Sequence, residues 1–315
     1  MSEFIYRELS KQSQLHDFID AWERAFDRQL NREAYSWLFG SSLNRIYVAE
    51  TASSEIAAGY CLLKHIASVN TAVSTTYLCN NVFTTPGYRT HNLFVRLGKA
   101  SLKDIEGDGN LALGIPNRLS IPGHRRVGWT IYERIGFLQK TTFKLLAPDA
   151  DIFVQELDVK DLEELEKLSF SLSLCRSFSV VKTVEYFRWR FLERPLTDRK
   201  YYIFVAKNRR NLEGYMVLSH YYKTNRLHVL DIDARHGSII KGLILAMCRF
   251  ADKNNIPIIN LWETTAWRSI FIQMGFSIGD EYSNLIFIEP YKPGDIAALP
   301  ERNVFNLVLG DNDVF

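Results

Sequence analysis

The side chains best placed to bind an anion lie in one turn, within the stretch VFTTPGYRTHNLF at residues 82–94. Residues 76–83 are rich in β-branched and aromatic residues and predict a strand, whereas apolar residues from Leu93 to Ala100 recur at helical spacing. The first N–H groups of a helix that follows a turn lack hydrogen-bond partners, and the helix dipole favours a negative charge beside them. Arg89 adds a full positive charge to this turn. An anion site and an ordinary strand-to-helix connection explain these residues about equally well.

A second candidate for phosphate or nucleotide binding is the triplet formed by Arg188, Trp189 and Arg190. Two planar cations beside an aromatic face can bind a phosphate and stack on a base. Packing of a helix that starts near Thr183 explains Trp189 better than a ligand site does, but it explains Arg190 less well. A basic run at 124–126 is typical of a solvated helix face.

Length and composition describe a globular protein of about two domains. The chain has 315 residues, of which 47% are hydrophobic and 23% are charged, and domains usually contain roughly 100 to 200 residues. The formal net charge of +2 argues against a broad nucleic-acid surface, although a local basic patch can still bind a phosphorylated ligand. We therefore expect no nucleic-acid partner, and nothing in the sequence indicates an oligomeric state.

Cysteine spacing and hydropathy favour the cytoplasm as the location. The four cysteines, Cys61, Cys79, Cys175 and Cys248, form no CxxC pair or His/Cys cluster, so the sequence predicts neither a metal site nor a disulfide framework. The N-terminal stretch MSEFIYRELS has early charges and no apolar segment, and no run approaches the ~18 apolar residues of a membrane span. We expect reduced, buried thiols and no membrane insertion.

Two parts of the sequence repeat the same order of elements. The stretches YVAETASSEIAAGYCLLKH at 47–65 and FVAKNRRNLEGYMVLSH at 204–220 each predict a hairpin whose second strand reads Gly-Tyr, apolar residues and His. A strand, a helix, an apolar strand and a short helix ending in Gly-aromatic follow each hairpin. A matching series of this length is hard to obtain by chance. The sequence therefore predicts two related α/β (mixed α+β) units, each a mixed twisted sheet flanked by helices.

The boundary between the units is expected near Pro148, where a Pro/Asp turn precedes a short strand and an acidic amphipathic helix. This places an N-terminal domain at 1–148 and a C-terminal domain at 149–315. His65 and His220 then occupy corresponding strand ends, where a half-buried structural role explains each better than a catalytic one.

The residues Val82, Thr84, Pro86, Tyr88 and Arg89 follow the spacing Val-x-Thr-x-Pro-x-Tyr-Arg at the end of a strand. Together with the order of elements, this stretch resembles the GNAT superfamily of acyl-CoA-dependent N-acyltransferases. The resemblance implies an acetyl-CoA-dependent N-acetyltransferase. In such a protein the turn after the strand binds the CoA pyrophosphate, and the strand edge binds the pantetheine arm.

Three further stretches resemble a tandem-GNAT subgroup whose members often accompany surface-polysaccharide or amino-sugar pathways: GIPNRLS at 114–120, YFRWRFLERP at 186–195 and LVLGDNDVF at 307–315. The subgroup implies the amino group of a nucleotide-linked sugar as the acceptor. An aminoglycoside, a peptide or another amine as acceptor, and a non-catalytic binding protein, are the alternatives.

The family pattern for the pyrophosphate turn, Arg/Gln-x-x-Gly-x-Gly/Ala, is altered here because Asn92 and Phe94 replace both glycines. Glycine lets the backbone approach a phosphate closely, but Asn tolerates left-handed backbone angles and Arg89 can still bind phosphate. The second unit has DARHGSIIKG at 233–242 in the equivalent place and lacks the Thr-x-Pro-x-Tyr-Arg series, so we expect the cofactor in the first unit only. The expected cofactor-binding residues are Val82, Phe83, Thr84, Tyr88, Arg89, Thr90, His91, Asn92, Leu93, Phe94 and Asn117.

Acyl transfer from a thioester to an amine needs a neutral amine, a polarised carbonyl and a proton for the leaving sulfur. Backbone N–H groups and alignment supply much of this, so a strong side-chain base is not required. The resemblance makes His65, Asp313, the terminal carboxylate of Phe315 and Tyr132 candidates for proton transfer. Spacing favours Tyr132 as a strand residue of the first unit, and a surface tail explains Asp313 and Phe315. The degenerate second unit is expected to contribute to the acceptor site. The substrate-binding candidates are Asn81, Arg188, Trp189 and Arg190.

Overall fold

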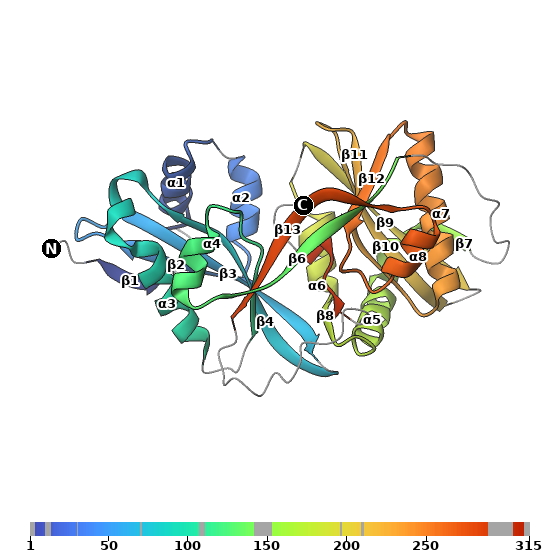
Figure 1. Cartoon of the computed structure of the whole chain (residues 1–315), viewed down its shortest axis with the longest axis horizontal. Coiled ribbons are helices and arrows are strands. Elements are labelled where there is room, and N and C mark those ends of the chain that lie inside the picture. Colours follow the sequence, from blue (N-terminus) through green and yellow to red (C-terminus); the bar gives the residue numbers. More distant parts are fainter. Residues whose placement is uncertain are drawn as a thin grey trace. The chain divides into compact units, whose positions relative to one another are not determined.

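The structure, a computed structural model of the chain, describes residues 4–9, 14–29, 31–69, 71–106, 111–141, 153–195, 197–208, 211–288 and 305–311. These residues form two compact units (Figure 1), and each unit combines a mixed β-sheet with helices. Of these residues, those within 4–65, Thr75–Arg134 and 283–288 belong to unit 1, and those within Ile66–Ser74, Ile135–Tyr282 and 305–311 belong to unit 2.

The first half of the chain builds most of unit 1. Its elements, in order, are β1 Ile5–Glu8, α1 Leu15–Phe26, α2 Arg32–Phe39, β2 Asn44–Glu50, β3 Ile56–Val69, β4 Ala72–Thr84, the 3-10 turn η2 Pro86–His91, α3 Leu93–Glu106, β5 Leu111–Gly114, α4 Ile121–Val127 and β6 Thr130–Lys140. In the sheet, β1 is antiparallel to β2 and β2 to β3, β4 lies beside β3, and β5 is parallel to β4.

The second half repeats this arrangement in unit 2. Its elements are β7 Phe153–Glu156, η3 Val159–Asp161, α5 Leu162–Ser173, β8 Phe178–Val181, α6 Val184–Phe187, the π-helical turn η4 Arg188–Leu192, β9 Arg199–Asn208, β10 Asn211–Tyr221, β11 Arg226–Ala234, α7 Gly237–Lys253, β12 Ile258–Trp262, α8 Arg268–Gln273, β13 Ser277–Ile288, β14 Phe305–Asn306 and η6 Leu309–Asp311. Strands β7, β9, β10 and β11 are successively antiparallel, and β12 is parallel to β11. The two mixed sheets flanked by helices confirm the predicted fold class.

The last strand of each sheet comes from the other half of the chain. Residues 286–288 of β13 are antiparallel to 112–114 of β5 in unit 1. Residues 137–140 of β6 are antiparallel to 259–262 of β12 in unit 2. The sequence repeat predicts two units, but it contains no sign of these exchanged strands.

One detail of the sequence prediction needs correction, and another lies outside the described residues. Strand β3 continues to Val69, so His65 lies inside the strand, whereas His220 is the penultimate residue of β10. The boundary expected near Pro148 falls outside the described residues, and the compact units separate between Arg134 and Ile135. Because the last strands are exchanged, no single cut in the chain separates the units.

Close packing explains why both hairpins carry a Gly-Tyr pair. A Cβ on Gly59 would lie 2.4 Å from the ring of Phe83, and a Cβ on Gly214 would lie 2.7 Å from Cβ of Ala234. Only glycine lets the neighbouring strand, β4 or β11, approach at these points. The tyrosines that follow, Tyr60 and Tyr215, are buried.

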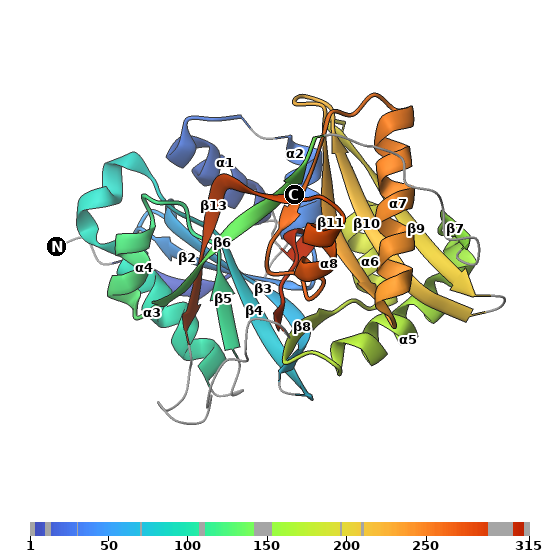
Figure 2. The same cartoon turned by 45° about the vertical axis from the view of Figure 1, so that its right-hand side comes forward.

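Helices cover both faces of each sheet. In unit 1, α3 and α4 pack on the face that carries Tyr60 and Cys79, and Phe18 of α1 packs on Phe83 of the other face. In unit 2, α7 lies along one face of the sheet (Figure 2), where Leu243 and Met247 are fully buried against the strands. The apolar stripes of these helices, at spacings of three and four residues, are the pattern from which the sequence predicts them.

Candidate functional site

Strand β4 extends beyond its neighbour β5, and the predicted cofactor turn begins there. The parallel pairing joins Thr76 through Cys79 to residues 111–114, and Gly114 is the last residue of β5. Residues 80–84 therefore lie past the end of β5. A strand edge without its neighbour exposes backbone groups that an extended ligand can pair with.

The turn after β4 brings the N-terminus of α3 to the surface. None of the η2 residues is buried, and Asn92, which caps the turn, has φ 58° and ψ 28°. Gly, Asn and Asp enter this left-handed region most readily, so Asn92 meets the backbone requirement where the family pattern has glycine. Helix α3 has no acidic residue in its first turn, so the helix itself places no negative charge against an incoming anion.

Two arginines reach this turn, but they have different partners. Arg126 of α4 donates from Nη2 to Oδ1 of Asn92 at 2.6 Å. The guanidinium of Arg89 instead donates to the backbone oxygens of Ala25 at 2.9 Å and of Thr84 at 3.4 Å. Arg126 therefore lies beside the N-terminus of α3, whereas Arg89 ties the turn to the end of α1. The basic run at 124–126, expected as a solvated face, thus supplies a cation that the sequence pattern alone did not indicate.

Aromatic rings line the turn on one side. The ring of Phe4 makes edge contacts with Tyr88 at 5.8 Å and with His91 at 5.3 Å between centroids. The hydroxyl of Tyr88 donates to Oε2 of Glu55 at 2.8 Å, and this hydrogen bond raises the pKa of the tyrosine. Thr90 lies 3.4 Å from the ring nitrogen Nδ1 of His91. These contacts hold the turn without using the N–H groups of α3.

The second glycine replacement, Phe94, packs beneath the turn. Its ring centroid lies 5.0 Å from that of His124, and a Cβ on Gly123 would lie 2.7 Å from the ring. Burial lowers the pKa of His124 to about 4, so this imidazole is neutral near pH 7. The only charged groups of the basic run at that pH are therefore Arg125 and Arg126.

The side chains of the predicted cofactor-binding residues differ in exposure, and the buried ones can contact a ligand only through their backbone. Phe83 and Leu93 are buried in the core, so their side chains do not reach the turn surface. Val82 and Thr84 are half-buried. Asn117 is exposed and accepts a hydrogen bond from the backbone N–H of Ser120 at 3.0 Å, which forms the turn before α4.

The candidates for proton transfer are only partly described. His65 is a buried residue of β3. Tyr132 belongs to β6, as expected for a strand residue, but its side chain is outside the described residues. Asp313 and Phe315 also lie outside them.

The triplet at 188–190 does not form an exposed platform. Arg188 is exposed, but Trp189 and Arg190 are buried in unit 2 at 9% and 2% exposure. Nε of Arg190 donates to the backbone oxygen of Gly310 at 3.3 Å. Thr183 caps α6 by accepting the backbone N–H of Tyr186, as the packing interpretation predicts. Of these three substrate-binding candidates only Arg188 is exposed, and the burial of Trp189 and Arg190 agrees with the packing interpretation.

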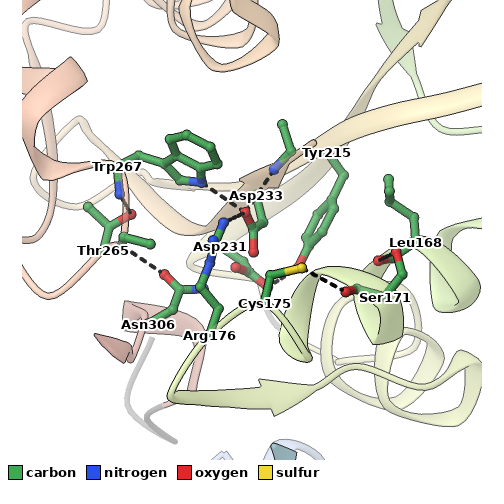
Figure 3. Close-up of polar contacts among 12 residues, drawn as sticks. Leu168, Ser171, Cys175, Arg176, Tyr215, Asp231, Asp233, Thr265, Trp267 and Asn306 are labelled. Carbon is green, nitrogen blue, oxygen red and sulfur yellow. Dashed lines mark hydrogen bonds and ion pairs between the residues drawn. The ribbon is translucent and has the colours of Figure 1, made fainter. Parts of the chain in front are cut away.

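Strand β11 of unit 2 ends in buried, internally paired carboxylates (Figure 3). Asp233 accepts hydrogen bonds from Arg176 at 2.7 Å and from the indole of Trp267 at 2.8 Å. Asp231 accepts from the hydroxyl of Tyr215 at 2.9 Å and lies 3.4 Å from Nζ of Lys182. Asp233 is the penultimate residue of β11, which leads into α7, the counterpart of α3.

Residues near the end of the chain complete this cluster. Asp311 pairs with Nζ of Lys182 at 3.0 Å, and both side chains are almost fully buried. Burial opposes the charge of Lys182, but the attraction of Asp231 and Asp311 outweighs it and raises the lysine pKa. Gly310 packs directly on β11, where a Cβ would lie 2.9 Å from the backbone oxygen of Leu230. The segment 305–311 thus covers β11 beyond its pairing with β12.

The described residues contain no further sign of metal or membrane chemistry. Among them, no His, Cys, Asp and Glu side chains gather into a group that could hold a metal ion. No helix in the described ranges is long and apolar enough to cross a bilayer. Three cysteines are buried, but Cys175 is exposed, which corrects the expectation of four buried thiols.

The sequence of unit 1 matches a known domain. Residues 6–132 match the family model of the acetyltransferase (GNAT) domain. No curated protein matches the sequence.

Solved structures share the fold over most of the chain. A GCN5-related N-acetyltransferase from Anabaena variabilis ATCC 29413 is 13% identical, with a TM-score of 0.76 over 92% of this chain and 73% of that one. A probable N-acyltransferase from Enterococcus faecalis V583 is 11% identical, with a TM-score of 0.72 over 92% and 73%. The N-myristoyltransferase of Saccharomyces cerevisiae with bound myristoyl-CoA is 12% identical, with a TM-score of 0.62 over 92% and 83%. The chain therefore shares the fold of these solved structures over most of its length, and its residues 6–132 match the GNAT acetyltransferase domain.

Proposed function

We propose that the chain is an acetyl-CoA-dependent N-acetyltransferase that binds its acyl donor in unit 1, along β4 and the turn before α3. One observation carries the proposal. An exposed helix N-terminus without acidic residues follows a left-handed Asn92, and Arg126 lies 2.6 Å from the side chain of that asparagine. Helix N-terminal N–H groups and a guanidinium together suit a pyrophosphate.

The residues of this region divide the binding between them. The N–H groups at the start of α3, with Arg126, hold the phosphates, and the backbone of 80–84 holds the pantetheine arm. Arg89 supports the turn through its bond to Ala25. The bound thioester supplies an activated acyl group, and alignment with the acceptor amine accounts for most of the rate. His65, Tyr132, Asp313 and Phe315 stay candidates for proton transfer.

The acceptor we propose is the amino group of a nucleotide-linked sugar. This choice rests on the resemblance to the tandem subgroup and not on a described contact, because a fold hosts many substrates. An aminoglycoside or a peptide amine is the alternative acceptor, and unit 2 is proposed to contribute to its binding.

A non-catalytic binding protein is the competing function, because both glycines of the pyrophosphate pattern are replaced. The conformation of Asn92 argues against a lost site, since the replacement keeps the left-handed backbone that glycine would supply.

Calorimetric titration with acetyl-CoA, followed by an acceptor panel, tests the proposal. We expect one binding event per chain and release of CoA thiol with at least one amine among UDP- and dTDP-linked amino sugars, aminoglycosides and peptides. Binding without CoA release for any acceptor would favour the non-catalytic function. No binding of acetyl-CoA would refute the proposal.

A further inference from the structure

Nδ2 of Asn80, a buried donor in β4, has no hydrogen-bond partner within the structure's described ranges. The residue is 7% exposed, and it is the first residue of β4 past the pairing of Cys79 with Gly114. A buried amide N–H without a partner costs about 1 to 3 kcal/mol, so native structures rarely keep one without a use for it.

A chain of hydrogen bonds determines which way this amide points. The indole of Trp22 can only donate, and its Nε1 lies 3.2 Å from Oδ1 of Asn81. The amide nitrogen of Asn81 is thereby directed at Oδ1 of Asn80, at 3.4 Å. Oδ1 of Asn80 accepts this hydrogen bond, and Nδ2 of Asn80 is left as the last donor in this series of hydrogen bonds.

The backbone at Asn81 supports the same conclusion independently. Its φ of 45° places a non-glycine residue in the left-handed region inside a strand. Such a conformation costs of order 1 kcal/mol or more, and strained residues of this kind cluster at functional sites. Neighbouring strand residues normally point to opposite faces, so the unusual backbone is what lets the two asparagine side chains meet.

We infer that Nδ2 of Asn80 donates a hydrogen bond to the carbonyl oxygen of the acyl group that is transferred. The inference rests on the proposed function, because it takes the acyl donor to lie along β4. A fixed, desolvated donor at the point where β4 leaves β5 can stabilise the negative charge that the carbonyl oxygen acquires in the reaction. Trp22 and Asn81 act as positioning residues for it.

The chemical step assigned to this donor is acyl transfer from sulfur to nitrogen. The lone pair of the neutral amine forms a C–N bond to the thioester carbon, and the C=O π electrons move to the oxygen that accepts from Asn80. When the C=O bond re-forms, the C–S bond breaks and its electrons leave with the sulfur of CoA. The proton lost by the amine balances the proton gained by the thiolate, so no other reactant is needed.

Calorimetry with acetyl-CoA and S-ethyl-CoA, which lacks the carbonyl oxygen, measures this contact without an acceptor. We expect Asn80→Leu and the smaller Asn80→Ser to lower the affinity ratio of acetyl-CoA to S-ethyl-CoA by about fivefold, the effect of one typical hydrogen bond. Affinity for S-ethyl-CoA should stay unchanged. The matched control is Thr76→Val, which removes another buried, unpartnered polar atom of β4 from the part paired with β5, and it should leave the ratio unaltered.

Infrared spectra of bound acetyl-CoA labelled at the carbonyl carbon give a second readout. The hydrogen bond should lower the C=O stretching frequency in the wild-type protein, and both Asn80 variants should move it back toward the value in solution. If neither variant folds, Trp22→Phe removes the indole donor that orients Asn81 and Asn80, and it should shift the C=O band in the same direction.

The outcomes separate the inference from the proposed function. If the wild-type protein does not bind acetyl-CoA, the proposed function fails. If it binds, and the affinity ratio and the carbonyl band are the same in the variants as in the wild type, Asn80 does not contact the acyl group and the inference alone is overturned.

Discussion

The strand-to-helix connections of the two units occupy the same place in the repeat but are built in opposite ways. In unit 1, residues 85–92 connect β4 to α3, none of the residues of η2 is buried, and Arg126 donates to Asn92 at the end of the turn. In unit 2, only Arg235 and His236 connect β11 to α7. There, the backbone N–H of Ala234 and the indole of Trp267 donate to Asp233.

The difference shows how one scaffold can leave this connection open in one copy and build a buried ionic centre beside it in the other. A carboxylate near a helix N-terminus uses the positive end of the dipole and repels a phosphate. In unit 2 the buried carboxylate of Asp233 lies just before the connection and is paired with Arg176, and the segment 305–311 covers the neighbouring part of β11. Unit 1 has no acid in the first turn of α3, where we propose that the acyl donor binds.

The largest effect should come from breaking the buried centre of unit 2. Replacing Lys182 with Met leaves Asp231 and Asp311 without their shared cation, and removing one partner of a buried ion pair costs about 3 to 5 kcal/mol. Urea unfolding should show a loss of this size, and the folded variant should bind acetyl-CoA with unchanged affinity. A loss below about 1 kcal/mol would mean that the cluster is not a structural centre.

Low pH should weaken both units, through one buried histidine in each. Burial lowers the pKa of His124 in unit 1 to about 4, and burial together with Arg199 and Arg226 lowers that of His228 in unit 2 to about 4. The unfolded chain, with histidine pKa near 6.5, then binds more protons between pH 4 and 6.5. The stability is therefore complete above about pH 6.5 and falls as pH drops toward 4, by up to about 3 kcal/mol for each histidine.

His124→Gln and His228→Gln should each flatten the dependence of unfolding free energy on pH in this window. Salt distinguishes the two units. It should screen the part of the pKa shift of His228 that comes from the arginines, but it should leave the shift of His124, which comes from burial. A slope unchanged by either substitution would contradict the burial account.

A smaller effect is expected from removing Arg126. A hydrogen bond to a charged group is worth about 1.5 to 3 kcal/mol, so Arg126→Ala should weaken acetyl-CoA binding by roughly tenfold or more. Arg125→Ala, on the same helix, and Arg235→Ala, in the connection of unit 2, are the matched controls and should change the affinity little. An equal loss of acetyl-CoA affinity for Arg235→Ala would contradict the assignment of the anion to unit 1.

Arg89→Ala sharpens the same comparison within unit 1. Because Arg89 donates to the backbone oxygen of Ala25, its removal should cost about 1 kcal/mol of stability as well as affinity. Comparing the free energies of unfolding of Arg89→Ala and Arg126→Ala tests this. Arg126→Ala should lose affinity for acetyl-CoA but little stability. If Arg126→Ala lost stability and Arg89→Ala lost only affinity, Arg126 would support the turn and Arg89 would bind the anion.

The smallest effect should follow from Asn92→Gly, which restores the family residue. The left-handed backbone is retained, so stability should change by less than about 1 kcal/mol, whereas Asn92→Ala should destabilise because its Cβ is strained at a φ of 58°. Thermal unfolding of the pair measures the contrast. A glycine variant less stable than the alanine variant would contradict the backbone argument.

Sequence patterns predicted the elements of both units because apolar spacing and turn residues are local properties. The helix from Leu93 and the strand Arg226–Ala234 follow directly from such spacing. The exchange of β6 and β13 could not be predicted, since their pairing depends on partners far away in the chain. The same holds for Arg126: its sequence context is that of a surface helix, and only packing of α4 on α3 brings it to Asn92.

Hydrogen–deuterium exchange with and without saturating acetyl-CoA tests the central claim, that only the connection of unit 1 binds the acyl donor. We predict slower exchange of backbone N–H groups at 80–96, and unchanged exchange at 230–240 around the connection of unit 2. Protection at 230–240, or none at 80–96 under conditions where calorimetry shows binding, would contradict the assignment.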